Sequence, residues 1–226
     1  MANGCWLWLG LYAAPPFCAS DMQGGGGEGS KRSGVTMALA HEPAASPCVA
    51  GMARSAPALL GAGRGVWHAE GIGEDELREG KAGSEMRGVL FWVNLARKDK
   101  GVELSAQLLN PQDVPVRQEG DAIVRVLVGD GSPVELGTPG LILDVELGRG
   151  GAYSSPVPSD FNGFVYMLEG EASFGANTWR ASRSQIAVLG PGRALSVVDA
   201  QPGTHFMLMA GKPYGETPVY NGPYVD

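Results

Sequence analysis

The stretch FVYMLEGEASFG, residues 164–175, gives the clearest indication of fold class in this chain. An apolar strand ends at a Glu-Gly turn, and a second short strand follows at once. Two downstream stretches, QIAVLGPGRALSVV (185–198) and THFMLMAGKP (204–213), continue the pattern, the first with a Gly-Pro-Gly turn between its apolar runs. Apolar strands at such close and regular spacing are typical of a β-sandwich or β-barrel.

Two upstream runs, AIVRVLVGDG (122–131) and LILDVELGRGG (141–151), have apolar residues at every second position, and in the second run Asp144 and Glu146 alternate with them. Successive side chains of a strand point to opposite faces, so one face of each run should pack into a core. Asp144 and Glu146 should then point outward. The residues that we expect to face the core are Val124, Val126, Val128, Leu141, Leu143, Val145 and Leu147.

The composition agrees with an all-β chain. Among 226 residues there are 35 glycines and 16 prolines, and 44% of the residues are apolar. Helix signals are confined to short turns at GEDELREGK (73–81) and NPQDVP (110–115). The formal net charge of −7 repels phosphate backbones. We therefore expect no direct binding to nucleic acid, and no apolar run is long enough to predict a membrane span.

Residues 1–57 have the composition of a low-complexity leader. QGGGGEGSKRSG (23–34) is typical of a flexible linker, and small residues with prolines follow it. We expect this leader to be disordered and not to pack as a domain. The three cysteines, Cys5, Cys18 and Cys48, all lie here without Cys-x-x-Cys spacing, which indicates neither a zinc site nor a disulfide scaffold and predicts a reducing compartment.

The segment GRGVWHAEG, residues 63–71, places His68 and Glu70 two positions apart. In an extended strand their side chains point the same way, so an imidazole and a carboxylate could reach one metal ion. The alternative is an ordinary polar pair at a strand end. The chain has three histidines, and the other two, His41 and His205, form no His-x-His pair.

Several motifs together resemble the pirin family, whose members contain two cupin barrels in tandem. They occur in the family's order: GRGVWHAE, GVLFWVNLARKDK, TPGLILDV, PSDFNGFVYMLEGE, AVLGPG, and HFMLMAGKPYGE followed by YNGPYV. The match extends from about residue 62 to residue 225 and covers the whole second barrel but only the end of the first. The resemblance implies an all-β fold of the cupin, or double-stranded β-helix (jelly-roll), type.

This resemblance also implies a domain organisation in which the first cupin is truncated. We expect a leader at 1–57, a remnant of the N-terminal cupin at 58–95, a connecting segment at 96–115 and a C-terminal cupin domain at 116–226. The family's His-x-His segment, which should precede Gly61, is not found in the chain.

By the same resemblance, His68 and Glu70 correspond to two of the family's four iron ligands. The other two ligands have no candidates, so we expect weak or absent iron binding in this chain. In the second barrel, Pro156-Val157-Pro158 occupies the positions where metal-binding cupins have His-x-His, and proline has no ligand atom. We therefore expect this barrel to be a metal-free scaffold with His205 as a structural histidine.

Three functions follow from the resemblance. The first is an iron-linked transcriptional co-regulator that works in nucleus and cytoplasm through a protein partner such as a transcription factor. The second is a quercetin 2,3-dioxygenase-like enzyme, in which Glu70 would be the base for the flavonol hydroxyl proton. The third is a truncated relative that has kept the second barrel and lost the chemistry.

Overall fold

The computed structural model describes residues 8–13, 35–41, 57–61, 87–100, 102–103, 105–109, 111–217, 220–221 and 224–225. Apart from the 3₁₀ turns η1 (Arg97–Asp99) and η2 (Pro111–Asp113), the regular elements in these ranges are strands, which confirms the all-β prediction. The η2 turn lies within the predicted turn NPQDVP. The chain divides into two compact units, which are described separately.

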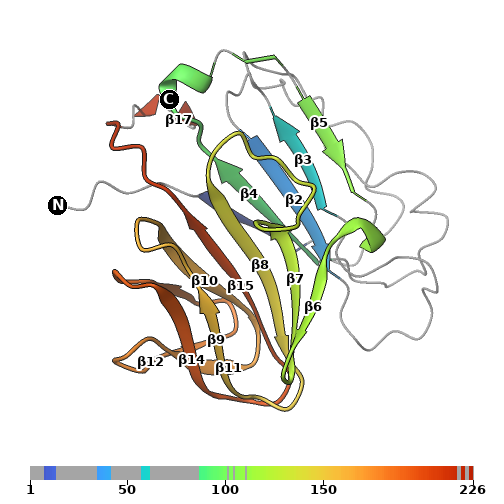
Figure 1. The fold of residues 1–226 in the computed structure, drawn as a ribbon, viewed down its shortest axis with the longest axis vertical. Coiled ribbons are helices and arrows are strands. Elements are labelled where there is room, and N and C mark those ends of the chain that lie inside the picture. Colours follow the sequence, from blue (N-terminus) through green and yellow to red (C-terminus); the bar gives the residue numbers. More distant parts are fainter. Residues whose placement is uncertain are drawn as a thin grey trace. The chain divides into compact units, whose positions relative to one another are not determined.

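The C-terminal unit, Gln112–Thr217, contains two antiparallel sheets (Figure 1). The six-stranded sheet has the order β13 (Ile186–Val188), β10 (Asn162–Glu169), β15 (Thr204–Gly211), β8 (Gly140–Leu147), β7 (Ala122–Val128) and β6 (Val116–Glu119). The four-stranded sheet has the order β12 (Trp179–Ser182), β11 (Glu171–Phe174), β14 (Ala194–Ala200) and β9 (Gly151–Pro156). Most neighbouring strands are therefore distant in sequence, as in a jelly roll.

The Glu-Gly turn predicted between β10 and β11 is confirmed. Gly170 lies between the two strands with φ 75°. A Cβ at this position would lie 2.7 Å from Oγ1 of Thr204, so both the backbone angle and the space favour glycine. This turn carries the chain from the six-stranded to the four-stranded sheet.

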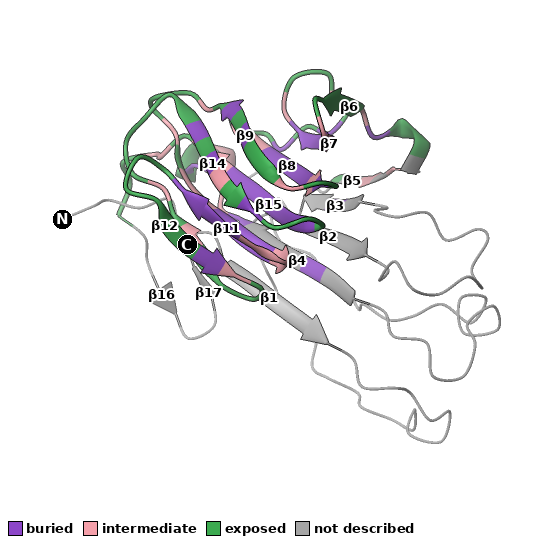
Figure 2. Cartoon of the chain, turned by 90° about the horizontal axis from the view of Figure 1, so that it is seen from below, coloured by how far each residue is buried: buried purple, intermediate pink, exposed green. Residues whose placement is uncertain are grey.

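The core of this unit lies between the two sheets. Phe206 of β15 is fully buried and contacts the rings of Tyr153 in β9 and Phe174 in β11, with centroid distances of 6.2 Å and 5.7 Å. Figure 2 shows the buried residues along β15 and β11 and the exposed ones along β12 and β6. The core cluster includes Val124, Val126, Leu143, Val145 and Leu147, with Leu141 packed against it, as the alternation predicted.

The prediction for Val128 is wrong. The register between β7 and β8 shifts between Val126 and Val128, so Val126 lies opposite Leu143 whereas Val128 lies opposite Ile142. Opposed residues in an antiparallel pair share a face. Because consecutive residues of β8 point to opposite faces, this β-bulge places Val128 on the face away from the core cluster.

The N-terminal unit contains a five-stranded antiparallel sheet. Its order is β1 (Trp8–Ala13), β4 (Arg87–Val93), β2 (Val35–His41), β3 (Pro57–Gly61) and β5 (Ser105–Leu108). β4 coincides with the apolar run GVLFWV and pairs with both β1 and β2. A short hairpin, β16 (Tyr220–Asn221) with β17 (Tyr224–Val225), also belongs to this unit.

Two of these strands, β1 and β2, lie inside the segment 1–57, for which the composition predicted a leader without packed structure. In β2, VTMALAH, larger residues alternate with small ones, which is the period of a strand and which the surrounding glycine-rich composition obscured. The other residues of the segment lie outside the described ranges. No helix in the described part of the chain is long and apolar enough to cross a membrane.

Candidate functional site

The predicted metal pair, His68 and Glu70, lies outside the residues that the structure describes. Its geometry therefore stays a prediction. His41 ends β2 and is paired in register with Arg87 of β4. The one histidine whose side chain is described is His205, in β15 of the C-terminal unit.

His205 belongs to a buried polar cluster with Asp144 of β8. The Nε2–H of His205 donates to Oδ1 of Asp144, and the two residues are 6% and 1% exposed. The other carboxylate oxygen of Asp144 lies 3.4 Å from Nη1 of Arg125 in β7, and Nη2 of the same guanidinium lies 3.5 Å from Oε2 of Glu146. A buried carboxylate needs such partners because it has left water.

The strand register explains why these side chains meet. Arg125 lies opposite Asp144, and Glu146 lies opposite His205. Cross-strand partners and residues two apart share one face, so the four side chains lie together on the face of the sheet away from the core cluster. Asp144 points away from the core, as predicted, but it is buried there rather than exposed to solvent.

The positions of these side chains show whether the described residues of the barrel could coordinate an iron ion. Among the described residues, no group of three or more His, Cys, Asp or Glu is placed to hold a metal. His205 already donates to Asp144 and faces away from the core, so its imidazole is not offered to the space inside the barrel. The described residues of the C-terminal unit therefore do not fit a cupin iron site.

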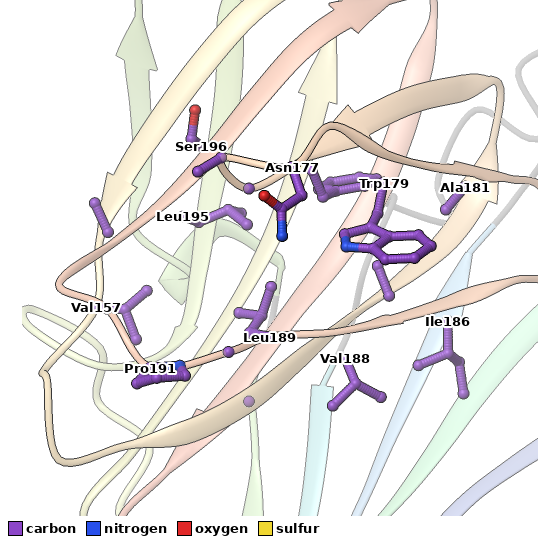
Figure 3. A pocket seen from close by; sticks show the side chains of 18 of the residues that line it. Val157, Asn177, Trp179, Ala181, Ile186, Val188, Leu189, Pro191, Leu195 and Ser196 are labelled. Atoms are coloured by element: carbon purple, nitrogen blue, oxygen red, sulfur yellow. The ribbon is translucent and has the colours of Figure 1, made fainter.

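A cavity of about 1180 Å³ in the C-terminal unit is lined by residues of β11, β12, β13 and β14 and of the loops beside them. Figure 3 shows Trp179 and Asn177 on one side of it, and Val157, Leu189 and Pro191 on another. Val157, the central residue of the segment Pro156-Val157-Pro158, packs against the core. The lining contains no histidine, cysteine or carboxylate among the described residues.

Among the described residues of the cavity wall, Arg180 of β12 is the one with a charged side chain, and it is ion-paired. Its Nε lies 2.6 Å from Oε1 of Glu171 in β11, and Nη2 contacts the same oxygen. These hydrogen bonds raise the pKa of the Arg180 guanidinium above its ordinary value. The described lining of the cavity thus contains one ion-paired charge and no imidazole, thiolate or carboxylate group.

Three exposed apolar residues in the lining of this cavity were not singled out from the sequence. Trp179 is 72% exposed, Ile186 49% and Val188 82%. The available signal was β13 itself, a three-residue apolar strand just before the Gly-Pro-Gly turn. Its neighbours in space come from segments distant in sequence, so no local pattern revealed the cavity.

Comparisons with known proteins agree with this architecture. The family model described as "Pirin C-terminal cupin domain" matches residues 142–226. A pirin-like protein of Solanum lycopersicum is 34% identical over 170 residues, and pirin of Homo sapiens is 32% identical over 171; each alignment covers 73% of this chain and 56% of the relative. The chain thus spans about half the length of the curated relatives that it matches.

Solved structures share the fold at lower identity. Protein GK1651 of Geobacillus kaustophilus superposes with a TM-score of 0.68 at 23% identity, covering 97% of this chain and 94% of that one. A quercetin 2,3-dioxygenase of Acinetobacter baumannii gives 0.71 at 22% identity, covering 97% and 78%. The predicted all-β cupin fold is confirmed.

Proposed function

The chain belongs to the pirin family, and on that basis we propose that it is a transcriptional co-regulator that acts through protein contacts. The proposal includes a protein partner such as a transcription factor and a location in nucleus and cytoplasm. It includes no direct contact with nucleic acid, since a chain with a net charge of −7 is repelled by phosphate backbones.

The observation that carries the proposal is the chemical character of the barrel cavity. Its described lining offers apolar surface, amide and hydroxyl groups, and one guanidinium that is ion-paired with Glu171. Acid-base or metal-assisted chemistry needs carboxylate, imidazole or thiolate groups directed at the reacting atoms. The described wall of this cavity has none of these groups, which supports recognition over catalysis as its function.

The experiment measures regulation and DNA binding separately. The full chain, tethered to a DNA-binding module in cells, should change the output of a reporter gene, whereas the purified chain should not shift a generic DNA duplex at physiological salt. A reporter that does not respond, or saturable binding to naked DNA, would contradict the proposal.

Iron enters the proposal through His68 and Glu70 alone. One imidazole and one carboxylate leave most of the coordination sphere to water and hold the ion weakly. After reconstitution with Fe(II) and removal of free metal, the chain should contain clearly less than one iron per molecule. Stoichiometric iron that is lost in His68→Ala would show a complete site instead.

The shared fold with a quercetin 2,3-dioxygenase makes flavonol cleavage the second function to test. In that case Glu70 would take the proton of the flavonol hydroxyl. Loss of flavonol absorbance should be absent in the wild-type chain with added Fe(II). Turnover that disappears in Glu70→Gln would replace the co-regulator proposal by an enzymatic one.

A further inference from the structure

We propose that the free edge of β13 is a docking site for an extended, uncharged apolar peptide segment of a partner protein, which adds as a further strand beside Ile186–Val188. The inference deepens the proposed function and rests on it for the existence of a protein partner. It assigns the contact to one strand edge and one kind of segment.

The first step is the direction of the backbone groups in β13. This strand is the terminal strand of its sheet and pairs with β10. The N–H of Leu189 donates to the carbonyl of Gly163 at 2.9 Å, and the N–H of Met167 donates to the carbonyl of Gln185 at 3.0 Å. Antiparallel bonding alternates along a strand, so residues 185, 187 and 189 face β10.

The backbone groups of Ile186 and Val188 therefore point to the outer side of the sheet. No strand pairs with that side of β13 within the described part of the chain. Such a row of N–H and C=O groups can bind another strand, which is the mode of recognition called β-augmentation.

The second step is that this edge lacks the usual protection. At the other end of the same sheet, β6 has Arg117 and Glu119, and charged residues discourage pairing with another chain. β13 carries no charge, and its outward side chains, Ile186 and Val188, are largely exposed. The two edge strands of this sheet thus differ in charge, and charge on an edge strand discourages the addition of another strand.

The third step is the cavity next to the edge. Ala187 and Leu189 of β13 pack toward the barrel core and help to line this cavity. Alternate side chains of an added strand would enter it, with Trp179 across from them (Figure 3). At about 1180 Å³ the cavity exceeds the volume of about 300–1,000 Å³ usual for a small-ligand pocket, which favours an extended segment.

Charge and symmetry define the occupant. The ion pair of Arg180 with Glu171 leaves no free charge on the described wall, so an uncharged segment is complementary. A second copy of this chain, paired through its own β13, would keep Ala187 and Leu189 in its own barrel. It could not fill the cavity, so a partner segment with protruding apolar side chains fits better.

The test uses fluorescein-labelled, end-blocked heptapeptides with Thr at the odd positions and Val, Leu or Phe at the three even positions. Binding to the full chain is measured by fluorescence anisotropy. We expect saturable binding of at least one peptide. Val188→Pro removes the outward N–H and leaves the bonds to β10 intact, because that N–H faces away from β10. Binding should weaken about tenfold, as expected when a main-chain hydrogen bond is lost and its acceptor is left unpaired.

Val188→Thr is the matched control, because it keeps both the amide and the β-branched shape. Its affinity should stay within about threefold of the wild-type value. Thermal melting followed by circular dichroism verifies that each variant is folded. Peptides that are N-methylated at alternate residues, so that they cannot donate to the edge, should not bind.

Three results would overturn the docking site. The first is that no peptide binds saturably up to about 1 mM. The second is that the peptides bind the wild-type chain and Val188→Pro with equal affinity. The third is that the chain forms a concentration-dependent dimer in sedimentation and that Val188→Pro abolishes this dimer, because the edge would then bind a second copy. The reporter assay of the proposed function is independent of these peptides. If the reporter responds but no peptide binds, the docking site is rejected and the proposed function stands. If a peptide binds but the reporter does not respond, the docking site stands and the proposed function is rejected.

Discussion

His205→Ala should lower the free energy of unfolding by about 2–3 kcal/mol at pH 7. The imidazole N–H donates to Asp144, which is 1% exposed, and a hydrogen bond to a charged group contributes about 1.5–3 kcal/mol. Leaving a buried charge without any partner costs about 3–5 kcal/mol. The loss should stay below that range because Arg125 remains 3.4 Å from the second oxygen of Asp144.

Urea unfolding followed by far-UV circular dichroism measures this loss, and a double-mutant cycle with Asp144→Asn isolates the pair. We expect the double variant to lose about 1–2 kcal/mol less than the sum of the two single variants. His205→Gln is the control, since its amide can donate toward the same oxygen and should restore part of the loss. A coupling below about 0.5 kcal/mol would refute the argument that His205 and Asp144 stabilise each other.

Three further predictions concern the C-terminal barrel. Phe206→Ala should cost about 3–5 kcal/mol in the same urea assay, because its fully buried ring contacts two others, and a loss near 1 kcal/mol would show that the core can collapse around the gap. Gly150→Ala should cost at least about 2 kcal/mol, since Gly150 has φ 77° and a Cβ would overlap the carbonyl oxygen of Ala200; an unchanged melting temperature would contradict this. Hydrogen bonds from the backbone N–H and then the side chain of Arg149 lower the pKa of Asp121, so its stabilising contribution is present above about pH 4 and is lost as the pH falls through the folded-state pKa. Asp121→Asn should accordingly flatten the acid side of the stability curve, and an identical acid limb in both proteins would count against it.

Strand positions and core-facing residues of the C-terminal unit were predictable because alternation is a local property. Val126 and Leu143 lie opposite each other in the core, as the period of two requires. Val128 was not predictable, because the β-bulge that turns it to the other face is a property of how two strands pair. A pattern within one strand does not record the register with its neighbour.

The buried cluster and the cavity were not predictable from the sequence, because each brings together residues that are far apart along the chain. Asp144 reads as a solvent-facing carboxylate in an alternating strand, yet it is buried with His205, a residue 61 positions away. The cavity wall likewise joins Val157, Trp179 and Leu189 from separate segments. For His68 and Glu70 the family resemblance alone supports a role, and the described residues neither add a ligand to that pair nor remove one.

The two ends of the six-stranded sheet differ in a way that bears on the proposed docking site. An exposed apolar strand edge promotes association, and natural sheets usually cover it or place charge on it. β6 places Arg117 and Glu119 on its edge, next to an exposed Val116, whereas β13 exposes Ile186 and Val188 and carries no charge. If this sheet lacked protected edges in general, β6 and β13 would both be unprotected. Because only β13 of these two lacks charged residues, its exposed edge needs a local explanation. Recognition of an extended segment supplies one, because the same features that would otherwise reduce solubility provide the hydrogen bonds and apolar contacts of the complex.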